Sequence, residues 1–274
     1  MPTILLHYFR SHKAAFAIAL IALSCGQSEL APTASGAAIS AHRIELGDSV
    51  AAAQHVRFVY ALSADREDRN FDMNGILGSS IERLQNWLSK QPGSRKLRIV
   101  LHDGQPETLF VRLRQTDAEL IRHGVRIRDA IERELISDRL IRKDEMYLLF
   151  YDGSGPEVCG NSAWPPVLRG SVAVKYLRGR NESPSCAPPA GGTNTVGIVI
   201  FDLSALHEIF HLLGAVPRCA PHHTRDGHVS GDPRDLMYAG PLQWKPSEID
   251  IGRDDYFDHG RRDCMDIAKS PYFE

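Results

Sequence analysis

The chain has 274 residues, of which 43% are hydrophobic and 24% charged, a composition typical of a globular protein long enough to bury a core. Its 32 Lys and Arg residues against 34 Asp and Glu residues give a formal net charge of -2, and no basic stripe with interleaved aromatic residues stands out. These values exclude a global field that would favour nucleic acid or an anionic membrane, so we expect one monomeric globular domain without a nucleic-acid partner.

The N-terminal residues 1–25 have the pattern of a secretory signal. Arg10 and Lys13 precede the apolar stretch Ala14–Leu23, which at about ten residues is too short to span a bilayer, since a span needs about 20. A buried N-terminal helix is the alternative. The segment Ala22–Cys25 also resembles a bacterial lipobox, although its Leu and its small residue stand in reversed order. A freely secreted protein and an envelope lipoprotein attached to the membrane through Cys25 therefore both stay open.

Four further cysteines support export, because an even number in a chain bound for an oxidising compartment indicates disulfide bonds. We predict that Cys159 pairs with Cys186, closing a Pro/Gly-rich loop, and that Cys219 pairs with Cys264, tying the C-terminal tail to the segment before it. A cysteine-based zinc site is the alternative, but no CxxC spacing occurs in the chain.

The predicted domain covers residues 42–274 and follows a linker over residues 26–41, whose Ser, Ala, Gly, Pro and Thr cannot build a core. Hydrophobic periodicity predicts an alternation of strands and helices in its first half, with a turn at Asp103-Gly104. The predicted strands are Val56–Leu62, 96–101, 108–113, 146–151 and 171–177, and the predicted helices are 76–90 and a long amphipathic one over 117–140. This order indicates an α+β fold with a mixed twisted sheet.

The second half is predicted to contain more loop. Residues 153–192 are dense in Gly, Pro, Ser and Cys, so apart from the strand 171–177 we expect irregular structure there. The apolar run Val196–Phe201 leads into a helix, and beyond Gly214 only short helical or irregular segments are expected, forming a loop-rich C-terminal subdomain.

That helix carries the pattern HExxH as His207-Glu208-Ile209-Phe210-His211. Two His residues four apart on a helix share one face, so both imidazoles can reach one tetrahedral Zn²⁺. Glu208 stands beside the first ligand without having to bind the metal, and could accept a proton from the water that the metal activates. A surface pair of histidines is the alternative interpretation.

Gly214 follows in the pattern HExxHxxG, and Asp235-Leu236-Met237-Tyr238 looks like a tight turn carrying Met downstream. Together these segments resemble the metzincin clan of zinc endopeptidases. Ala220-Pro221-His222, Gly227-His228 and the tail Arg253–Phe257 are similar to a group of secreted bacterial zincin-like proteins. The resemblance implies a metzincin-like fold in which a long helix and an active-site helix pack on the sheet, together with bound Zn²⁺.

The third metal ligand departs from the metzincin pattern, because Pro217 occupies its place and cannot bind a metal. From ligand chemistry alone, His222 is the first candidate to replace it and His228 the second, followed by His223 and Asp226. For each histidine, a solvated loop position is the alternative.

Two further patterns admit two interpretations each. Tyr238 could donate a hydrogen bond to an oxyanion, as the resemblance implies, although it stands one residue after the Met rather than two; a packed or surface Tyr is favoured. Asn70-x-Asp72-x-Asn74-Gly75 is similar to the start of a calcium loop, but Ile81 stands where Glu is wanted, so a helix-capping turn is favoured.

The predicted function is therefore an exported zinc endopeptidase that acts on a peptide or protein substrate, with Glu208 as its general base. Two other functions stay open: a zinc amidase acting on a non-protein substrate, and an envelope or binding protein in which zinc only staples loops. A site with three protein ligands and an open fourth position would favour hydrolysis, whereas a closed site of four ligands would favour the staple.

Overall fold

A computed structural model describes residues 43–47, 54–156, 158–182 and 186–274. The predicted signal over residues 1–25, with Cys25, the linker over residues 26–41 and the predicted domain start at His42 lie outside the described residues. None of the helices in the described part of the chain is long and apolar enough to cross a bilayer.

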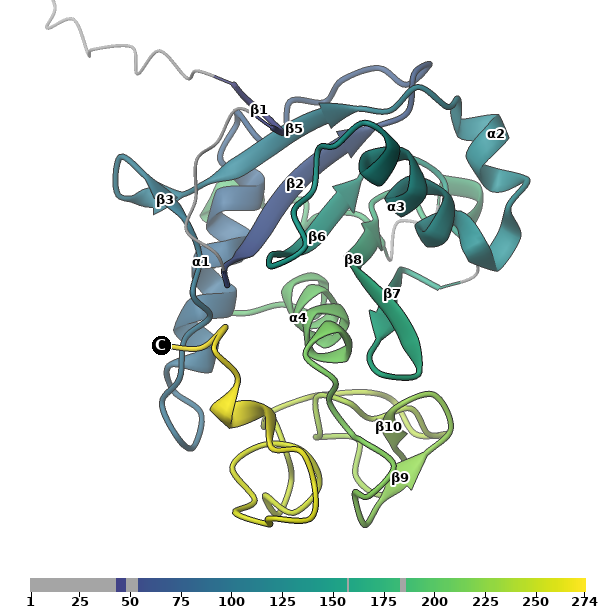
Figure 1. The fold of residues 1–274 in the computed structure, drawn as a ribbon. Coiled ribbons are helices and arrows are strands. Elements are labelled where there is room, and N and C mark those ends of the chain that lie inside the picture. Colours follow the sequence, from purple (N-terminus) through teal and green to yellow (C-terminus); the bar gives the residue numbers. More distant parts are fainter. Residues whose placement is uncertain (1–42, 48–53, 157, 183–185) are drawn as a thin grey trace, which may run out of the picture. The chain divides into compact units, whose positions relative to one another are not determined.

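A six-stranded sheet forms the centre of the structure, in the order β1-β5-β2-β6-β8-β7 (Figure 1). All neighbouring strands are parallel except β7, which runs antiparallel to β8 and forms one edge. The strands are β1 Ile44–Glu45, β2 Val56–Leu62, β5 Thr108–Arg112, β6 Met146–Tyr151, β7 Gly160–Trp164 and β8 Leu168–Tyr176. The prediction of a mixed sheet combined with helices is confirmed, although the sheet is mostly parallel, as in α/β proteins, rather than of the predicted α+β class.

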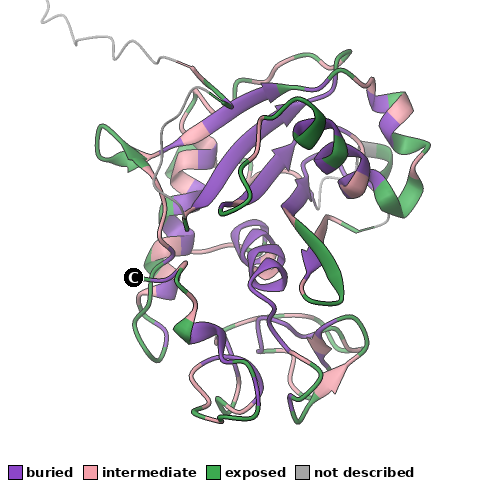
Figure 2. Ribbon diagram, viewed as in Figure 1, coloured by how far each residue is buried: buried purple, intermediate pink, exposed green. Residues whose placement is uncertain are grey.

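Helices cover both faces of this sheet (Figures 1 and 2). The helices are α1 Ile76–Leu88, α2 Asp117–Ile121, α3 Ile127–Ser137 and α4 Ile200–Leu212, and the short 3₁₀ segments are Gly124–Arg126, Arg180–Glu182, Gly192–Asn194 and Ile267–Lys269. Successive side chains of a strand point to opposite faces, so Phe58 and Tyr60 of β2 pack in one core with α1 and α4, while Val59 packs in the other with α3. Because both faces are covered, all seven residues of β2 are buried, as is usual for a central parallel strand.

The predicted long helix over 117–140 is wrong in one respect, because it is broken into α2 and α3. Gly124 adopts a left-handed conformation with φ 58°, which a continuous α-helix cannot contain. The apolar side chains on both sides of the break face the same core, so their periodicity concealed it.

The predicted strand over 96–101 is also wrong. Leu97 and Ile99 make only isolated bridges, to Phe273 and Val56. The side chain of Gln85 on α1 bonds both the backbone N–H and the carbonyl of Leu97, which replaces a strand partner. The predicted turn at Asp103-Gly104 joins two short strands, β3 Leu101–His102 and β4 Gln105–Pro106.

Strand β7 lies in a segment for which the sequence predicts loop. Its residues, GNSAW, have little β propensity, and β7 forms because β8 offers it an unpaired edge. The correction matters because β7 borders the candidate site described below.

The C-terminal segment after Gly214 contains little regular structure, as predicted. Its only strands among the described residues are β9 His223–Thr224 and β10 His228–Val229, which pair with each other. Both predicted disulfide bonds are confirmed: Cys159–Cys186 and Cys219–Cys264, with Cα–Cα distances of 5.1 and 5.5 Å. Two disulfide bonds indicate an oxidising compartment.

Candidate metal centre

Helix α4 is fixed at its start by a buried carboxylate. Asp202 accepts a hydrogen bond from the backbone N–H of Val199, and Arg83 and Ser80 of α1 donate to the same side chain. The helix is apolar on nearly all sides and lies between the sheet and the C-terminal segment. Gly214 ends it in a left-handed conformation with φ 83°, which turns the chain as the sequence predicts.

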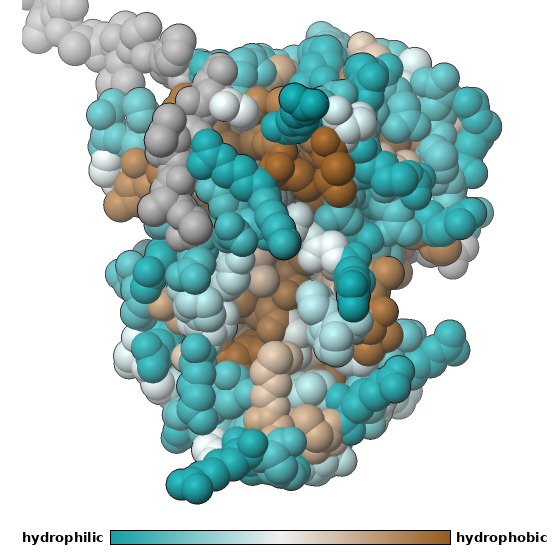
Figure 3. Space-filling view, in the orientation of Figure 1, coloured by the Kyte–Doolittle hydropathy of each residue, from teal (hydrophilic) through white to brown (hydrophobic). Residues whose placement is uncertain are grey.

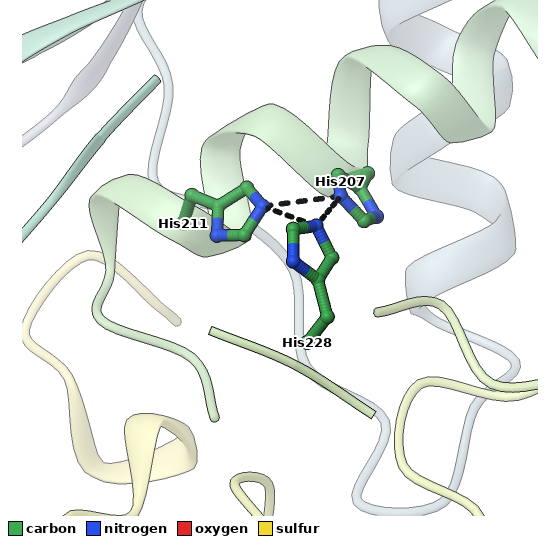
Figure 4. A group of neighbouring side chains, drawn as sticks. All are labelled: His207, His211 and His228. Atoms are coloured by element: carbon green, nitrogen blue, oxygen red, sulfur yellow. Dashed lines mark hydrogen bonds between the residues drawn. The ribbon is translucent and has the colours of Figure 1, made fainter. Parts of the chain in front are cut away.

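Three histidines from two segments converge beside this helix (Figure 4). His207 and His211 lie one turn apart on α4, and His228 reaches them from β10. Their Nε2 atoms are 3.1 Å apart for His207 and His211, 3.2 Å for His207 and His228, and 3.1 Å for His211 and His228. Ligand atoms at about 2.0–2.1 Å from one tetrahedral zinc lie about 3.3 Å from each other, so the triangle has the size of a zinc site.

The tautomers of these rings also fit a cation. His207 Nδ1 lies 2.8 Å from the carbonyl oxygen of Leu236, to which it can only donate, so the Nε2 of a neutral ring carries a lone pair. His228 Nδ1 lies 3.4 Å from the carbonyl of Arg225 in the same sense. Lone pairs that face each other at 3.2 Å repel, and a cation between them removes that repulsion.

The electrostatic surroundings keep all three rings neutral. Burial lowers the pKa of His207 to about 4 and lowers the pKa of His211 well below its usual value; it also lowers the pKa of His228. Charge on one ring would further disfavour charge on its neighbours. Neutral imidazole is the form that binds a metal.

Glu208 occupies the position beside these ligands that HExxH predicts. Its side chain is buried against β7, where a Cβ placed on Gly160 would lie 2.3 Å from Glu208 Oε1. The carboxylate therefore fits only because residue 160 has no side chain. Burial raises the pKa of Glu208, and the positive charge of Lys175 opposes that shift.

The site opens into a cleft of about 690 Å³, whose lining includes the three histidines, Glu208 and residues of β7. Trp244 stands edge-on to the His207 ring, with centroids 5.8 Å apart. Several exposed apolar side chains lie at the cleft, and Figure 3 shows apolar surface between the hydrophilic surfaces of the sheet layer and the C-terminal segment. These apolar lining residues are Val158, Val167 and Leu168.

His222, the first candidate for the third ligand, does not lie in this group. Its ring and its backbone N–H both face Asp255, at 3.0 and 2.7 Å, and that carboxylate raises the pKa of His222. The ring is held at the surface, where its Nδ1 forms a second group with Asp254 and Asp255. The structure brings His228, the second candidate, to His207 and His211, and places His222 in another group.

The other two candidates are not among the three converging rings either. His223 Nδ1 faces the carbonyl of Val216, and its ring stacks on Trp164 with centroids 5.7 Å apart. Asp226 lines the cleft but stands in the turn between β9 and β10. This turn has Asp226 and Gly227 in left-handed conformations.

The sequence contained a signal for His228 that our prediction did not use. Asp-Gly flanked by β-branched residues favours a tight hairpin. Asp226-Gly227 lies between Thr224 and Val229, so the hairpin β9–β10 could have been expected. In this hairpin His228 pairs with Thr224.

Tyr238 lies at the cleft with its ring buried. Its hydroxyl oxygen accepts a hydrogen bond from the backbone N–H of Leu242 at 2.9 Å. The same segment contributes Leu236, whose carbonyl orients His207, and the buried Met237. Of the packed and surface positions that the sequence favours, the structure shows the packed one.

The turn that is similar to a calcium loop leads directly into α1, whose N-cap is Gly75. Asn74 Oδ1 accepts a hydrogen bond from the N–H of Ile76 at the start of α1. The guanidinium of Arg43 binds both carboxylate oxygens of Asp72, with distances of 2.8 Å. The Arg43 guanidinium thus already pairs with the Asp72 carboxylate, which a bound calcium ion would need as a ligand.

Comparison with known proteins adds little to these observations. No protein-family profile and no curated protein matches this sequence. Among solved structures, a catalytically inactive form of OgpA from Akkermansia muciniphila, in complex with an O-glycopeptide substrate, is similar over 63% of this chain and 50% of its own, with 14% identity and a TM-score of 0.35. This chain thus spans about half the length of OgpA.

Archaemetzincin from Methanopyrus kandleri is similar over 70% of this chain and 84% of its own, with 15% identity and a TM-score of 0.32. Both likenesses are too weak to assign a family or an activity. The functional argument therefore depends on the geometry of the site.

Proposed function

We propose that this protein is a zinc-dependent endopeptidase of the metzincin-like type, with His207, His211 and His228 as metal ligands and Glu208 as general base. The observation that carries the proposal is the triangle of three Nε2 atoms, 3.1–3.2 Å apart, in an open cleft that also contains Glu208. Three neutral imidazoles are the donor set of several catalytic zinc sites.

The donor count favours hydrolysis over a structural staple. Within the described residues, no fourth His, Cys, Asp or Glu joins the group of three histidines. Structural zinc sites are usually closed by four protein ligands, whereas catalytic sites keep one position for water or substrate. Here the remaining position would face the cleft.

When bound, Zn²⁺ would supply Lewis-acid chemistry, activating water and polarising a carbonyl group. Glu208 would accept the proton of the attacking water and then deliver it to the leaving amine. Leu236 holds the His207 ring in the tautomer that a ligand requires. The reaction needs no covalent intermediate with the protein.

A peptide substrate is favoured by the edge strand. Among the described residues β7 pairs with no strand other than β8, so it is an edge strand, and its residues 160–162 line the cleft together with Glu208. An extended peptide can add to such an edge through main-chain hydrogen bonds. A non-protein amide would not use them, which places an amidase second. We also propose that the protein is exported and monomeric, and that it is either freely secreted or attached to the membrane through Cys25.

Glu208→Gln tests the proposal because it removes the base without removing a ligand. We expect the metal content to stay near one zinc per chain while cleavage of a denatured protein mixture falls about 10²- to 10⁴-fold. His211→Ala should lose zinc and activity together. Cleavage by Glu208→Gln at the wild-type rate would refute the mechanism. Zinc binding without any cleavage by the wild type, with unfolding of His211→Ala, would support the structural staple.

A further inference from the structure

A buried lysine lies on β8, the strand next to β7. Lys175 of β8 is only 1% exposed, although an ammonium group loses strong hydration when it enters a protein core. Buried charges are retained where another charge or a polar group compensates for this loss. The surroundings of Lys175 therefore indicate what its charge does.

The strand directs Lys175 toward helix α4. Ala173, two residues earlier on β8, packs in the core that α4 shares with α1, and side chains two apart on a strand point to the same face. The Nζ of Lys175 lies 5.2 Å from the ring centroid of Phe201 on α4. Phe201 and Glu208 are seven residues apart, or about two helical turns, so they lie on the same side of α4.

Strand β7 also shows that Lys175 and Glu208 lie close together. Gly160 is directly opposite Lys175 in the antiparallel register, where Cβ positions are about 4.5–5.5 Å apart. A Cβ on Gly160 would meet Glu208 Oε1 at 2.3 Å. The Lys175 side chain and the Glu208 carboxylate thus enter one buried space, which the missing side chain of Gly160 leaves free.

The charge of Glu208 acts on Lys175. Burial lowers the pKa of Lys175, and the negative charge of Glu208 raises it.

We propose that Lys175 is a positioning residue for Glu208: its ammonium attracts the carboxylate toward β7 and β8 and so holds the general base at the side of the cleft. This inference rests on the proposed function, because it assigns Lys175 a part in placing that reaction's base.

A double-mutant cycle on urea unfolding tests the interaction without using activity. Lys175→Met keeps the length of the side chain and removes its charge. In the presence of Glu208 it should lower the unfolding midpoint, because a buried carboxylate loses its counter-charge. In a Glu208→Gln background it should lower the midpoint less, or raise it, because it then removes an uncompensated ammonium. We expect a coupling of about tenfold in the unfolding equilibrium constant, with and without bound zinc.

Arg83→Met is the matched control for this cycle. Arg83 is also a buried cation facing α4, but it bonds Asp202 at the start of the helix. Its effect should add to that of Glu208→Gln. Additive effects for Lys175→Met, or the same coupling for Arg83→Met, would overturn the proposal. If Lys175→Met does not fold, Lys175→Gln replaces it in the cycle.

The kinetic readout separates positioning from a general loss of structure. Lys175→Met should keep its zinc and its KM while kcat falls about tenfold, and should cause no further loss in Glu208→Gln. Equal losses in both backgrounds would refute the positioning role. If the wild type cleaves nothing, the proposed peptidase function fails, whereas the unfolding cycle still decides whether Lys175 and Glu208 interact.

Discussion

The sheet layer and the C-terminal segment (residues 214–274) bury their backbone by different means. In the sheet layer, parallel strands satisfy each other's N–H and carbonyl groups, and the apolar side chains of β2, β6 and β8 form the cores. The C-terminal segment has only the short hairpin β9–β10 among the described residues. In the C-terminal segment, aspartate side chains accept hydrogen bonds from backbone N–H groups, as neighbouring strands do in the sheet layer.

Two of these buried carboxylates organise most of the C-terminal segment. Asp235 accepts hydrogen bonds from the N–H groups of Met237 and Ile251, and Asp250 accepts them from three successive N–H groups, those of residues 255–257. The disulfide Cys219–Cys264 closes the segment. A core with few strands can thus be built from carboxylates that cap backbone amides, but it becomes dependent on their protonation.

The candidate metal centre joins the two regions, so the largest effect is expected at His228, the proposed ligand that the C-terminal segment contributes. His228→Ala should lose zinc and activity as completely as His211→Ala, because one of three ligands is removed in each. His222→Ala is the matched control, since His222 faces Asp255 instead. Metal analysis and peptide cleavage measure both variants; zinc loss from His222→Ala with retention in His228→Ala would invert the assignment.

A pH dependence should distinguish the C-terminal segment from the sheet layer. Burial raises the pKa of Asp235 to about 7, above its value in the unfolded chain, so the folded protein holds the proton more tightly. Stability from this group is full below about pH 4 and is lost as the pH rises toward about 7, by on the order of 4 kcal/mol. Asp250, whose pKa is raised to about 6, adds to the loss below that pH.

Asp235→Asn should therefore remove the decline in unfolding free energy between about pH 6 and 7, measured by urea titration. The variant is less stable overall, because an amide N–H₂ meets backbone donors at this position. The half-buried Asp232, whose pKa is lowered rather than raised, gives the control: Asp232→Asn should leave the slope between about pH 6 and 7 unchanged. An unaltered slope in Asp235→Asn would show that the carboxylate stays ionised in the fold.

Gly160→Ala is expected to affect catalysis more than stability. The added Cβ would lie 2.3 Å from Glu208 Oε1, the mobile end of a side chain, so the carboxylate should shift while the sheet stays intact. A displacement of about 1 Å at a reacting group can cost about 100-fold in rate. Cleavage kinetics and zinc content give the measurement. At Gly231, a Cβ would meet nothing within 4 Å, so Gly231→Ala should keep full activity.

The smallest effect is expected at the cap of α1 in the sheet layer. Asn74→Ala removes the hydrogen bond to the Ile76 N–H and should cost about 1 kcal/mol in thermal unfolding. The exposed change Asn86→Ala, in the last turn of α1, should cost nothing. Added Ca²⁺ should not change the melting temperature of the wild type or of Asn74→Ala. If Ca²⁺ raised the melting temperature of the wild type but not that of Asn74→Ala, the turn would be a calcium site after all.

The sequence by itself determined the features whose signal is local. The bounds of β2 follow from a run of β-branched and aromatic residues, and the facing pair His207 and His211 follows from helical spacing. The even cysteine count and the loop positions predicted the two disulfide bonds, which are present. The position of Glu208 next to His207 follows from the motif alone.

Only the tertiary structure decided the features that depend on distant partners. Strand β7 exists because β8 leaves an edge unpaired, and residues 96–101 are not a strand because Gln85 takes the backbone groups of Leu97. His222 and His228 have the same chemistry, and ligand type cannot rank them. Asp255, which is 33 residues after His222 in the sequence, holds His222 at the surface. The tight hairpin β9–β10 directs His228 toward α4 instead. Both placements depend on contacts that only the folded chain brings together.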